Sequence, residues 1–382
     1  MLAQIIESSG LADIHEKVVA GHRLGVEEGV RLYRSPHLTV VGHLANIVRE
    51  RKNGDRAYYI RNLHVNYTNV CNKLCKFCSF YAPPGDERGY VLSPSQVQER
   101  LRPFRSARLS EVHVVGGIHP KLPYSYYLDL LRAIKEERPD VHVKAFTMIE
   151  LAQVARVARK PLSEVMPELR EAGLDSCPGG GAEVFSDRVH EELFRAKLDN
   201  EGWFDVARAV HTAGLRSNAT MLYGHIETVE EKARHLVHIR ELQDETGGFL
   251  CFIPLAFDPQ RTELSHLSAT TGEQNLREIA VARLMLDSFD HIKAFWIMIT
   301  PAIAQLALWY GADDIDGTVS HYEITHALGS ASDTQHQDED ELVHLIRMAR
   351  RRPVERNTLY GEINPVAPTS PAPAPPAVVR AS

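Results

Sequence analysis

Hydrophobic residues recur with two different spacings along most of this chain. From about residue 60 onward, short runs typical of β-strands alternate with longer segments whose apolar residues fall at the three-and-four spacing of amphipathic helices. The strand-like runs are RNLHVNYTN (61–69), SEVHVVGG (110–117), VHVKAFT (141–147), LDSCPGGG (174–181), RSNATMLYG (216–224), GFLCFIPLAF (248–257), IKAFWIMIT (292–300) and, less clearly, DDIDGTV (313–319). The helix-like segments are 93–106, 125–139, 162–173, 200–214, 228–247 and 272–288. This alternation predicts an α/β fold, a TIM-type (β/α) barrel, with an open doubly wound sheet as the alternative.

Two flanking regions do not follow this alternation. Residues 3 to about 52 carry helical spacing in three segments that are broken by Gly and Ser-Pro, which predicts an N-terminal helical extension. The segment INPVAPTSPAPAPPAVVRAS (363–382) is rich in Pro and Ala and has too little apolar surface to bury, which predicts a flexible tail. The expected organisation is an extension over residues 1–55, a barrel over 56–362 and the tail over 363–382.

Composition narrows the class of protein. The 382 residues carry a formal charge of −7 and 44% hydrophobic residues, which gives no basic surface for nucleic acid or an anionic membrane. No segment approaches the roughly 18 consecutive apolar residues of a membrane span, and the N-terminal stretch lacks the pattern of a signal peptide. We therefore expect a cytoplasmic protein with no nucleic-acid partner and no membrane insertion.

The stretch VCNKLCKFC brings Cys71, Cys75 and Cys78 together within eight residues. This spacing is too tight for regular secondary structure, so we expect a loop around a [4Fe–4S] cluster in which each thiolate binds one iron. The fourth iron is then open to the amino and carboxylate groups of S-adenosylmethionine (SAM). The alternatives are a zinc site completed by His64 or His113, three buried free thiols, and a non-catalytic iron–sulfur electron carrier.

Glycine-rich or polar segments follow several of the predicted strands. They are VVGGIHP (114–120), CPGGGAE (177–183), TMLYGHIE (220–227) and FIPLAF (252–257). Each such cluster alone is typical of a turn. In a parallel barrel, however, the carboxyl ends of the strands share one mouth, where barrel enzymes keep their active sites. We therefore expect these segments to surround the cysteine loop.

Strand alternation also predicts which side chains face the barrel interior. His64, Asn66 and Thr68 share one face of the first strand, and a polar row pointing inward indicates a ligand cavity; the alternative is that this row touches the outer helices. On the fifth strand, Asn218, Thr220 and Leu222 share one face, whereas Ala219, Met221, Tyr223 and His225 share the other.

Charged residues outside these segments predict structural roles. The acidic runs DDID (313–316) and DEDE (338–341) are typical of solvated loops or helix starts, and we assign no metal to them. Arg283 lies on an apolar helix, where a structural ion pair is favoured over a substrate carboxylate.

The cysteine motif with Phe77, together with VVGG and T-x-L-x-G-x-x-E, resembles the radical SAM superfamily. The segments HVNYTNVC, TMIELAQVAR, CPGGGAEVF, SNATMLYGHIET, HIRELQDETGGFLCFIPLAF and GADDIDGTV are similar to its menaquinone-pathway (futalosine) branch over about residues 60–330. Within that branch the chain most resembles the aminofutalosine synthases. The sibling activities stay open, because FYAPPGDERGYVLS looks like the dehypoxanthine futalosine cyclase and HYEITHALG departs from the synthase pattern; the tyrosine-using deazaflavin cofactor synthase is the other sibling.

This resemblance implies a radical SAM transferase that consumes SAM as a co-substrate, together with a set of site residues. The expected set is Cys71, Cys75 and Cys78 as cluster ligands, Phe77, Gly116, Gly117 and Glu183 at SAM, Asn66, Thr68 and Tyr223 at the substrate, and Thr220 and His225 in catalysis. The implied partners are a small-molecule substrate and a reducing electron donor of the flavodoxin or ferredoxin type. A homodimer is one option for the oligomeric state.

Overall fold

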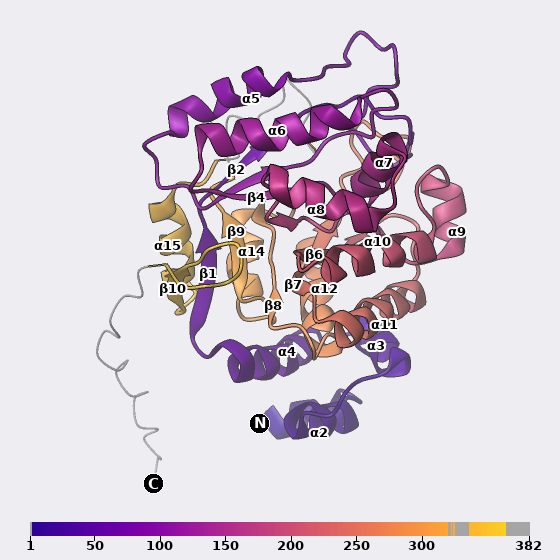
Figure 1. The fold of residues 1–382 in the computed structure, drawn as a ribbon. Helices are drawn as coiled ribbons and strands as arrows, with labels where there is room; N and C mark the ends of the chain where they lie inside the picture. The colour runs from indigo at the N-terminus through magenta and orange to yellow at the C-terminus, as the bar shows by residue number, and fades with distance from the viewer. Residues whose placement is uncertain (1, 320–321, 323, 325–335, 364–382) are drawn as a thin grey trace.

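Parallel strands and helices alternate through the chain in the computed structural model, which describes residues 2–319, 322, 324 and 336–363 (Figure 1). The strands are β1 (Arg56–Ile60), β2 (Asn62–Val65), β3 (Glu111–Val114), β4 (His142–Ala145), β5 (Ser176–Cys177), β6 (Arg216–Tyr223), β7 (Phe249–Ala256), β8 (His291–Ile292), β9 (Asp314–Gly317) and β10 (Arg352–Glu355). The α-helices are α1 (Leu2–Ser8), α2 (Ala12–Ala20), α3 (Val26–Arg34), α4 (Leu38–Asn53), α5 (Pro94–Leu101), α6 (Tyr124–Glu137), α7 (Met148–Ala158), α8 (Leu162–Ala172), α9 (Asp187–Val189), α10 (Asn200–Thr212), α11 (Val229–Thr246), α12 (Gly272–Met285), α13 (Trp296–Ile299), α14 (Pro301–Ala307) and α15 (Glu339–Met348). A short 3₁₀ turn covers Arg102–Phe104 and a π-helical turn covers His190–Phe194.

The strands curl into a barrel. Seven of them form one parallel sheet in the order β2-β3-β4-β5-β6-β7-β8, and a second parallel sheet has the order β10-β1-β9. Strand β9 lies between the two edges, because Asp314 bridges to Lys293 just after β8 and is also in register with Tyr58 of β1. Strand β1 continues into β2 through Arg61. The expected TIM-type barrel is therefore confirmed.

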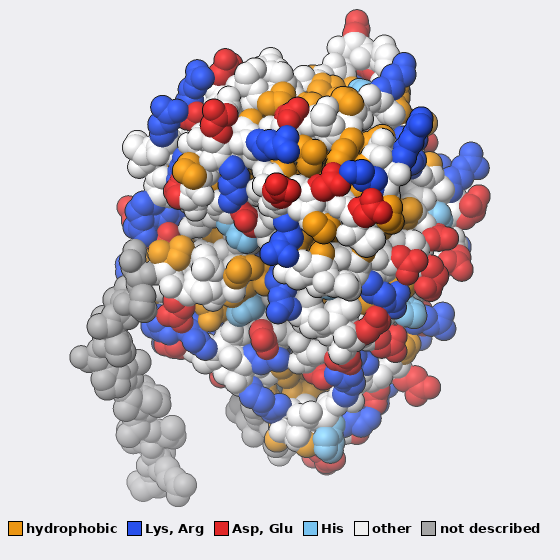
Figure 2. All heavy atoms as spheres, in the orientation of Figure 1, with side chains coloured by type: hydrophobic (Ala, Val, Ile, Leu, Met, Phe, Trp, Pro, Cys, Tyr) orange, Lys and Arg blue, Asp and Glu red, His pale blue; other side chains and the backbone are white. Residues whose placement is uncertain are grey.

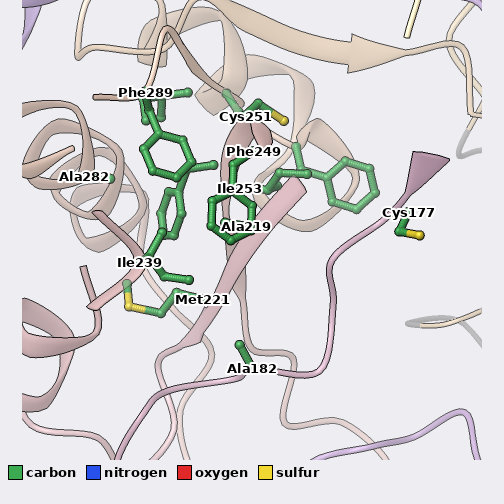
Figure 3. Packing of buried hydrophobic residues seen from close by; sticks show 14 of the residues in the cluster. Cys177, Ala182, Ala219, Met221, Ile239, Phe249, Cys251, Ile253, Ala282 and Phe289 are labelled. Atoms are coloured by element: carbon green, nitrogen blue, oxygen red, sulfur yellow. The ribbon is translucent and has the colours of Figure 1, made fainter. Parts of the chain in front are cut away.

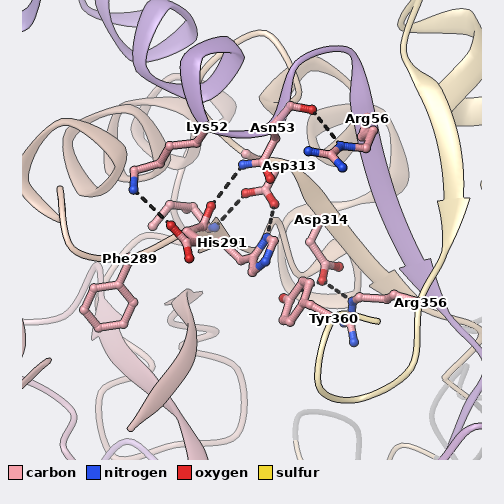
Figure 4. A network of polar contacts seen from close by, with 12 residues as sticks. Lys52, Asn53, Arg56, Phe289, His291, Asp313, Asp314, Arg356 and Tyr360 are labelled. Atoms are coloured by element: carbon pink, nitrogen blue, oxygen red, sulfur yellow. Dashed lines mark hydrogen bonds and ion pairs between the residues drawn. The ribbon is translucent and has the colours of Figure 1, made fainter. Parts of the chain in front are cut away.

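Three carboxylates at β9 hold this closing strand in place, and all three are buried. The ion pairs are Arg283–Asp313 (2.5 Å), Arg356–Asp314 (2.7 Å) and Lys293–Asp316 (2.5 Å). Figure 4 shows how His291 and Tyr360 complete the first two pairs, with His291 Nδ1 2.6 Å from Asp313 and the Tyr360 hydroxyl donating to Asp314 at 2.6 Å. Buried charges are tolerated only when they are paired in this way.

Local sequence signals explain where several helices begin. Ser93, Thr147, Thr228, Thr271 and Asp338 each accept a hydrogen bond from the third residue of the following helix, whose Glu or Gln side chain bonds back to the cap. Such capping boxes satisfy backbone donors that the first helical turn leaves unpaired. The DEDE run thus begins helix α15, and the expectation of a helix start there is confirmed.

The N-terminal helices pack on the barrel rather than standing apart from it. Helix α3 contacts α11 and α12, and α4 contacts α12, at the lower edge of Figure 1. The contact is close at Gly29, where an added Cβ would lie 3.0 Å from the Met285 side chain. The boundaries expected at residues 55 and 362 stay predictions, and the expected tail lies outside the described residues apart from Ile363.

The core lies between the barrel wall and its helices. On β6 and β7, Ala219, Met221 and Phe249 pack with Ile239 and Phe289, as Figure 3 shows. Burying a side chain of this size contributes about 1.5–3 kcal/mol.

The face in Figure 2 has basic and acidic side chains interspersed. Among the described helices, none is both long and apolar enough to cross a membrane.

Two expectations about secondary structure were wrong. The DDID run is neither a solvated loop nor a helix start, because Asp313, Asp314 and Asp316 are buried at β9. The run 292–300 is not a strand: β8 ends at Ile292, and the WIMI segment forms helix α13. Apolar runs of this length do not distinguish a strand from a buried helical turn. Strands β1 and β10 and helices α7 and α14 were not expected from the sequence. The expectation that Arg283 makes a structural ion pair is confirmed by its buried contact with Asp313.

Replacing Arg283 tests how strongly the closing strand depends on its ion pairs. Arg283→Met leaves the buried Asp313 carboxylate without its arginine partner, and breaking a buried pair costs about 3–5 kcal/mol. Urea unfolding should show this loss. Arg132→Met, which removes an exposed pair with Asp129, should cost at most about 1 kcal/mol. Equal losses for the two variants would contradict the role given to β9.

Candidate active site

A cavity of about 300 Å³ opens where the carboxyl ends of the barrel strands meet. The residues at its mouth are Cys71, Cys75, Phe77, Cys78, Gly116, Gly117, Thr147, Gly180, Gly181, Glu183 and Lys197. Its wall is formed by Val115, Thr220, Leu222, Ile253, Leu255, Phe295 and Tyr322. Its floor is formed by His64, His113, Asn218, Lys293 and Asp316. The cysteine loop and the glycine-rich segments therefore surround one cavity. The placement of the mouth follows from the topology, because all strands from β2 to β8 are parallel.

Backbone hydrogen bonds to neighbouring segments and within the loop hold the cysteine loop. Cys71 N donates to Ala82 O at 3.0 Å, Lys76 N donates to Leu193 O at 3.0 Å, and Cys78 N donates to Cys75 O at 3.1 Å. The loop turns at Leu74, whose φ of 49° is in the left-handed region. The three thiols are thus fixed on one side of the cavity by the surrounding backbone.

The three thiols fit an iron–sulfur cube better than a single metal ion. Burial raises the pKa of Cys75 to about 12 and also raises that of Cys78, so their deprotonation has to be driven by metal binding. Among the described residues, no three His, Cys, Asp or Glu side chains converge to hold one ion. A cube has its irons at separate corners and its thiolate ligands need not converge. His64 and His113 lie on the cavity floor, where their rings stack at 4.6 Å.

A buried ion pair lies beside the cysteines. Lys197 Nζ donates to Glu183 at 2.5 Å and lies 5.0 Å from the centre of the Phe77 ring. Burial disfavours the charged ammonium, but Cys75 and Glu183 outweigh it and raise the pKa of Lys197. The lysine is therefore a fixed positive charge next to the thiols. Glu183 has a φ of 48°, which turns it into the cavity wall.

The paired glycines allow the strand end to approach the cysteine loop. A Cβ on Gly117 would lie 2.5 Å from Val70 O, and one on Gly116 would lie 2.7 Å from the Tyr67 ring. Gly116 N donates to Glu150 at 3.0 Å, and Tyr67 OH donates to the same carboxylate at 2.9 Å. Glu150 therefore fixes the glycine segment against the first strand.

Thr220 faces the cavity, but two of its neighbours on the same segment point elsewhere. Tyr223 OH donates to Asn275 at 2.8 Å on helix α12, on the outer face of the sheet. His225 Nε2 lies 3.1 Å from Leu222 O, and its Nδ1 accepts from Ile226 N at 2.8 Å. The His225 ring thus fixes the turn after β6 instead of lining the cavity.

Of the polar row expected on the first strand, His64 lines the cavity. Asn66 Nδ2 donates to Val115 O at 2.8 Å, and Thr68 Oγ1 donates to Tyr90 O at 2.6 Å. These two side chains tie the segment before the cysteines to neighbouring backbone. Their contacts are structural ones around the site.

Sequence reasoning missed several cavity residues. Lys197 follows a π-helical turn, a feature often found at functional sites but not readable from sequence. Lys293 and Asp316 lie 23 positions apart and meet only because β8 and β9 are adjacent. The one sign of this pair in the sequence was the lysine within the apolar run KAFWIMI, since a charged residue buried among apolar ones needs a partner.

Comparison with known proteins gives two family matches. The profile of the Radical SAM superfamily matches residues 65–238, and that of the CofH/MqnC C-terminal region matches residues 246–368. A solved structure of methylornithine synthase superimposes with a TM-score of 0.69 at 18% identity, covering 89% of this chain and 96% of that one, which supports the fold.

Curated relatives span nearly the whole chain. An aminodeoxyfutalosine synthase from Thermus thermophilus is 46% identical and covers 94% of this chain and 97% of its own. A 5-amino-6-(D-ribitylamino)uracil–L-tyrosine 4-hydroxyphenyl transferase from Methanoculleus marisnigri is 38% identical, covering 92% and 97%. A cyclic dehypoxanthine futalosine synthase from Halalkalibacterium halodurans is 34% identical, covering 91% and 93%.

The Glu150 carboxyl should make stability depend on pH. Burial raises its pKa from 4.5 to about 7, so the folded state favours the protonated acid. The contribution of the protonated Glu150 carboxyl to the free energy of unfolding is at most about 3 kcal/mol. It is complete below about pH 4.5 and is lost as the pH rises through 7. Urea unfolding between pH 5 and 8 should show that the free energy of unfolding of the wild type falls with rising pH relative to that of Glu150→Gln. Parallel pH profiles would contradict the raised pKa.

Proposed function

We propose that this chain, which belongs to the radical SAM superfamily and carries its CofH/MqnC C-terminal region, is an aminodeoxyfutalosine synthase. The observation that carries the proposal is its similarity to the Thermus thermophilus synthase, which exceeds its similarity to the transferase and the cyclic futalosine synthase over comparable lengths. The cavity beside the cysteines supports an enzyme over an electron carrier, since a carrier needs no space for a substrate.

The cofactors of the superfamily are a [4Fe–4S] cluster and SAM, and the cavity mouth has residues for both. Cys71, Cys75 and Cys78 hold the cluster. When bound, the cluster supplies the electron that cleaves SAM to methionine and a 5′-deoxyadenosyl radical. Gly116 and Gly117 line the cavity mouth and are proposed to contact SAM through their backbone, which the absence of Cβ atoms brings close to Tyr67 and Val70 beside the cysteine loop.

The substrate we propose is 3-[(1-carboxyvinyl)oxy]benzoate. The radical adds to its vinyl double bond, and the aryl group of the adduct migrates from oxygen to carbon. The resulting radical loses the vinyl carboxylate, one electron is returned to replace the one that cleaved SAM, and a water is taken up, which gives 6-amino-6-deoxyfutalosine, bicarbonate and a proton. The chain's task is to hold the double bond against the 5′ carbon and to exclude competing hydrogen donors. The largely apolar wall formed by Val115, Leu222, Ile253, Leu255 and Phe295 suits contact with the aromatic ring of this substrate and so helps to hold it in place.

The remaining site residues enter the proposal in two groups. Phe77, Glu183 and Thr220 line the cavity and are proposed to contact SAM or the substrate. Asn66, Thr68, Tyr223 and His225 make the hydrogen bonds to neighbouring residues described above, which supports a positioning role for them. We further propose a flavodoxin- or ferredoxin-type electron donor and a cytoplasmic location, where reducing conditions favour an iron–sulfur enzyme.

Product identity tests the proposed function. The protein is reconstituted anaerobically with iron and sulfide, reduced with dithionite, and given SAM with or without 3-[(1-carboxyvinyl)oxy]benzoate. Mass spectrometry should detect 6-amino-6-deoxyfutalosine only when the benzoate is present. SAM cleavage without the adduct would instead favour the cyclase or the tyrosine-using transferase, and dehypoxanthine futalosine or tyrosine would then be tried in its place.

Removing one cluster ligand should abolish the chemistry. Cys75→Ala should lose most of the bound iron and all SAM cleavage, because two thiolates do not retain the cube. Cys177→Ala is the matched control, since Cys177 is equally buried but lies on β5 outside the loop. The control should keep its iron content. Full turnover by Cys75→Ala would contradict the assignment of the cluster.

A further inference from the structure

The cavity floor contains polar atoms with no partner. His64 on β2 and Asn218 on β6 both line the cavity, and they are only 4% and 1% exposed. Within the described part of the chain, His64 Nε2 and Asn218 Oδ1 have no hydrogen-bond partner. Buried polar atoms are rarely left without a hydrogen bond, because nothing then compensates for the free energy lost when they are removed from water. A ligand with polar atoms of its own is the expected partner.

The floor also carries a buried cation. Lys293 lines the cavity and donates to Asp316 at 2.5 Å, and an ammonium group has three N–H donors. His113 stacks on the His64 ring, and Tyr322 meets that ring edge-on at 5.3 Å. Burial, followed by the neighbouring His113, lowers the pKa of His64 well below its usual value, so the ring is neutral and has one N–H to donate. Donors near a cation favour an anionic ligand group.

The direction of the strands orders the cavity from floor to mouth. His64 on β2 precedes Cys71 in the loop that follows this strand, and Asn218 precedes Leu222 on β6. The polar floor therefore lies toward the amino ends of the strands, and the thiols lie beyond their carboxyl ends. The wall between them is mainly apolar. A ligand with an anionic end, an aromatic middle and a reacting end at the mouth matches this order.

We propose that His64, Asn218 and Lys293 bind the ring carboxylate of the substrate. The inference rests on the proposed function, since 3-[(1-carboxyvinyl)oxy]benzoate carries one carboxylate on the vinyl carbon and one on the ring. The vinyl end has to meet SAM beside the cysteines, so the ring carboxylate points away from them, toward the floor. The Asn218 amide presents its NH₂ group to the carboxylate after a half-turn about its terminal bond.

Two unreactive probes separate the ring carboxylate from the rest of the ligand. The compound 3-(1-carboxyethoxy)benzoate is the saturated substrate analogue, and 2-phenoxypropanoate lacks the ring carboxylate. Their dissociation constants are measured by calorimetry on the reconstituted protein with SAM. The wild type should bind the dicarboxylate about 10- to 100-fold more tightly, the range of a charge-assisted hydrogen bond.

Two independent variants should lose this preference. His64→Phe keeps the ring stacked on His113 but removes its N–H. The double variant Lys293→Met with Asp316→Asn removes the ammonium without leaving a buried carboxylate unpaired. Each should bring the ratio of the two dissociation constants to within about 3-fold of unity, with the loss falling on the dicarboxylate and 2-phenoxypropanoate still bound. His238→Phe on helix α11, a half-exposed histidine, is the control and should keep the wild-type ratio.

The outcomes distinguish this subsite from the proposed function. If both variants are folded and keep the wild-type preference, the ring-carboxylate subsite is wrong while the synthase activity stands. If the wild type binds neither probe yet still cleaves SAM, the substrate itself is wrong, and both proposals are overturned.

Discussion

The ion pairs at strand β9 are the constraint on which the rest of the structure depends. β9 is the strand that joins the edge of the seven-stranded sheet at β8 to β1, and its three buried carboxylates pair with Arg283, Arg356 and Lys293. Buried ion pairs add little net stability over apolar packing. A strand in the wrong register, however, would leave buried charges without partners, so the ion pairs specify the register of β9. Closing the barrel at this register also sets the floor of the cavity, because Lys293 and Asp316 form one of these ion pairs and also line the floor.

The closed barrel separates two kinds of chemistry along its axis. At the mouth, the cysteine loop approaches the glycine-rich strand ends closely, and Lys197 places a positive charge beside the thiols. At the floor, His64, Asn218 and the Lys293–Asp316 ion pair surround polar atoms that have no partner among the described residues. The wall between mouth and floor is mainly apolar, which suits contact with an aromatic ring. This order explains how one cavity can hold both SAM and an aromatic dicarboxylate in a productive orientation.

Much of this arrangement could be predicted from sequence, because its signals are local. The cysteine spacing, the alternation of strands and helices, and the glycine-rich strand ends lie within short windows, and the barrel and the single mouth followed from them. Contacts between distant segments could not be read in that way. Tyr223 and His225 were placed by motif, but their hydrogen bonds to Asn275 and Leu222 depend on packing. The Lys293–Asp316 pair likewise exists only once β9 closes the barrel.

Radical addition to the vinyl group can be followed through the 5′ carbon of SAM. The reconstituted protein is given SAM labelled with carbon-13 at that position together with 3-[(1-carboxyvinyl)oxy]benzoate, and the nucleosides are analysed by nuclear magnetic resonance. The label should appear in a new carbon–carbon bond of the product, because the radical adds to the vinyl group. Label recovered only as the methyl carbon of 5′-deoxyadenosine would show hydrogen abstraction and would contradict this addition.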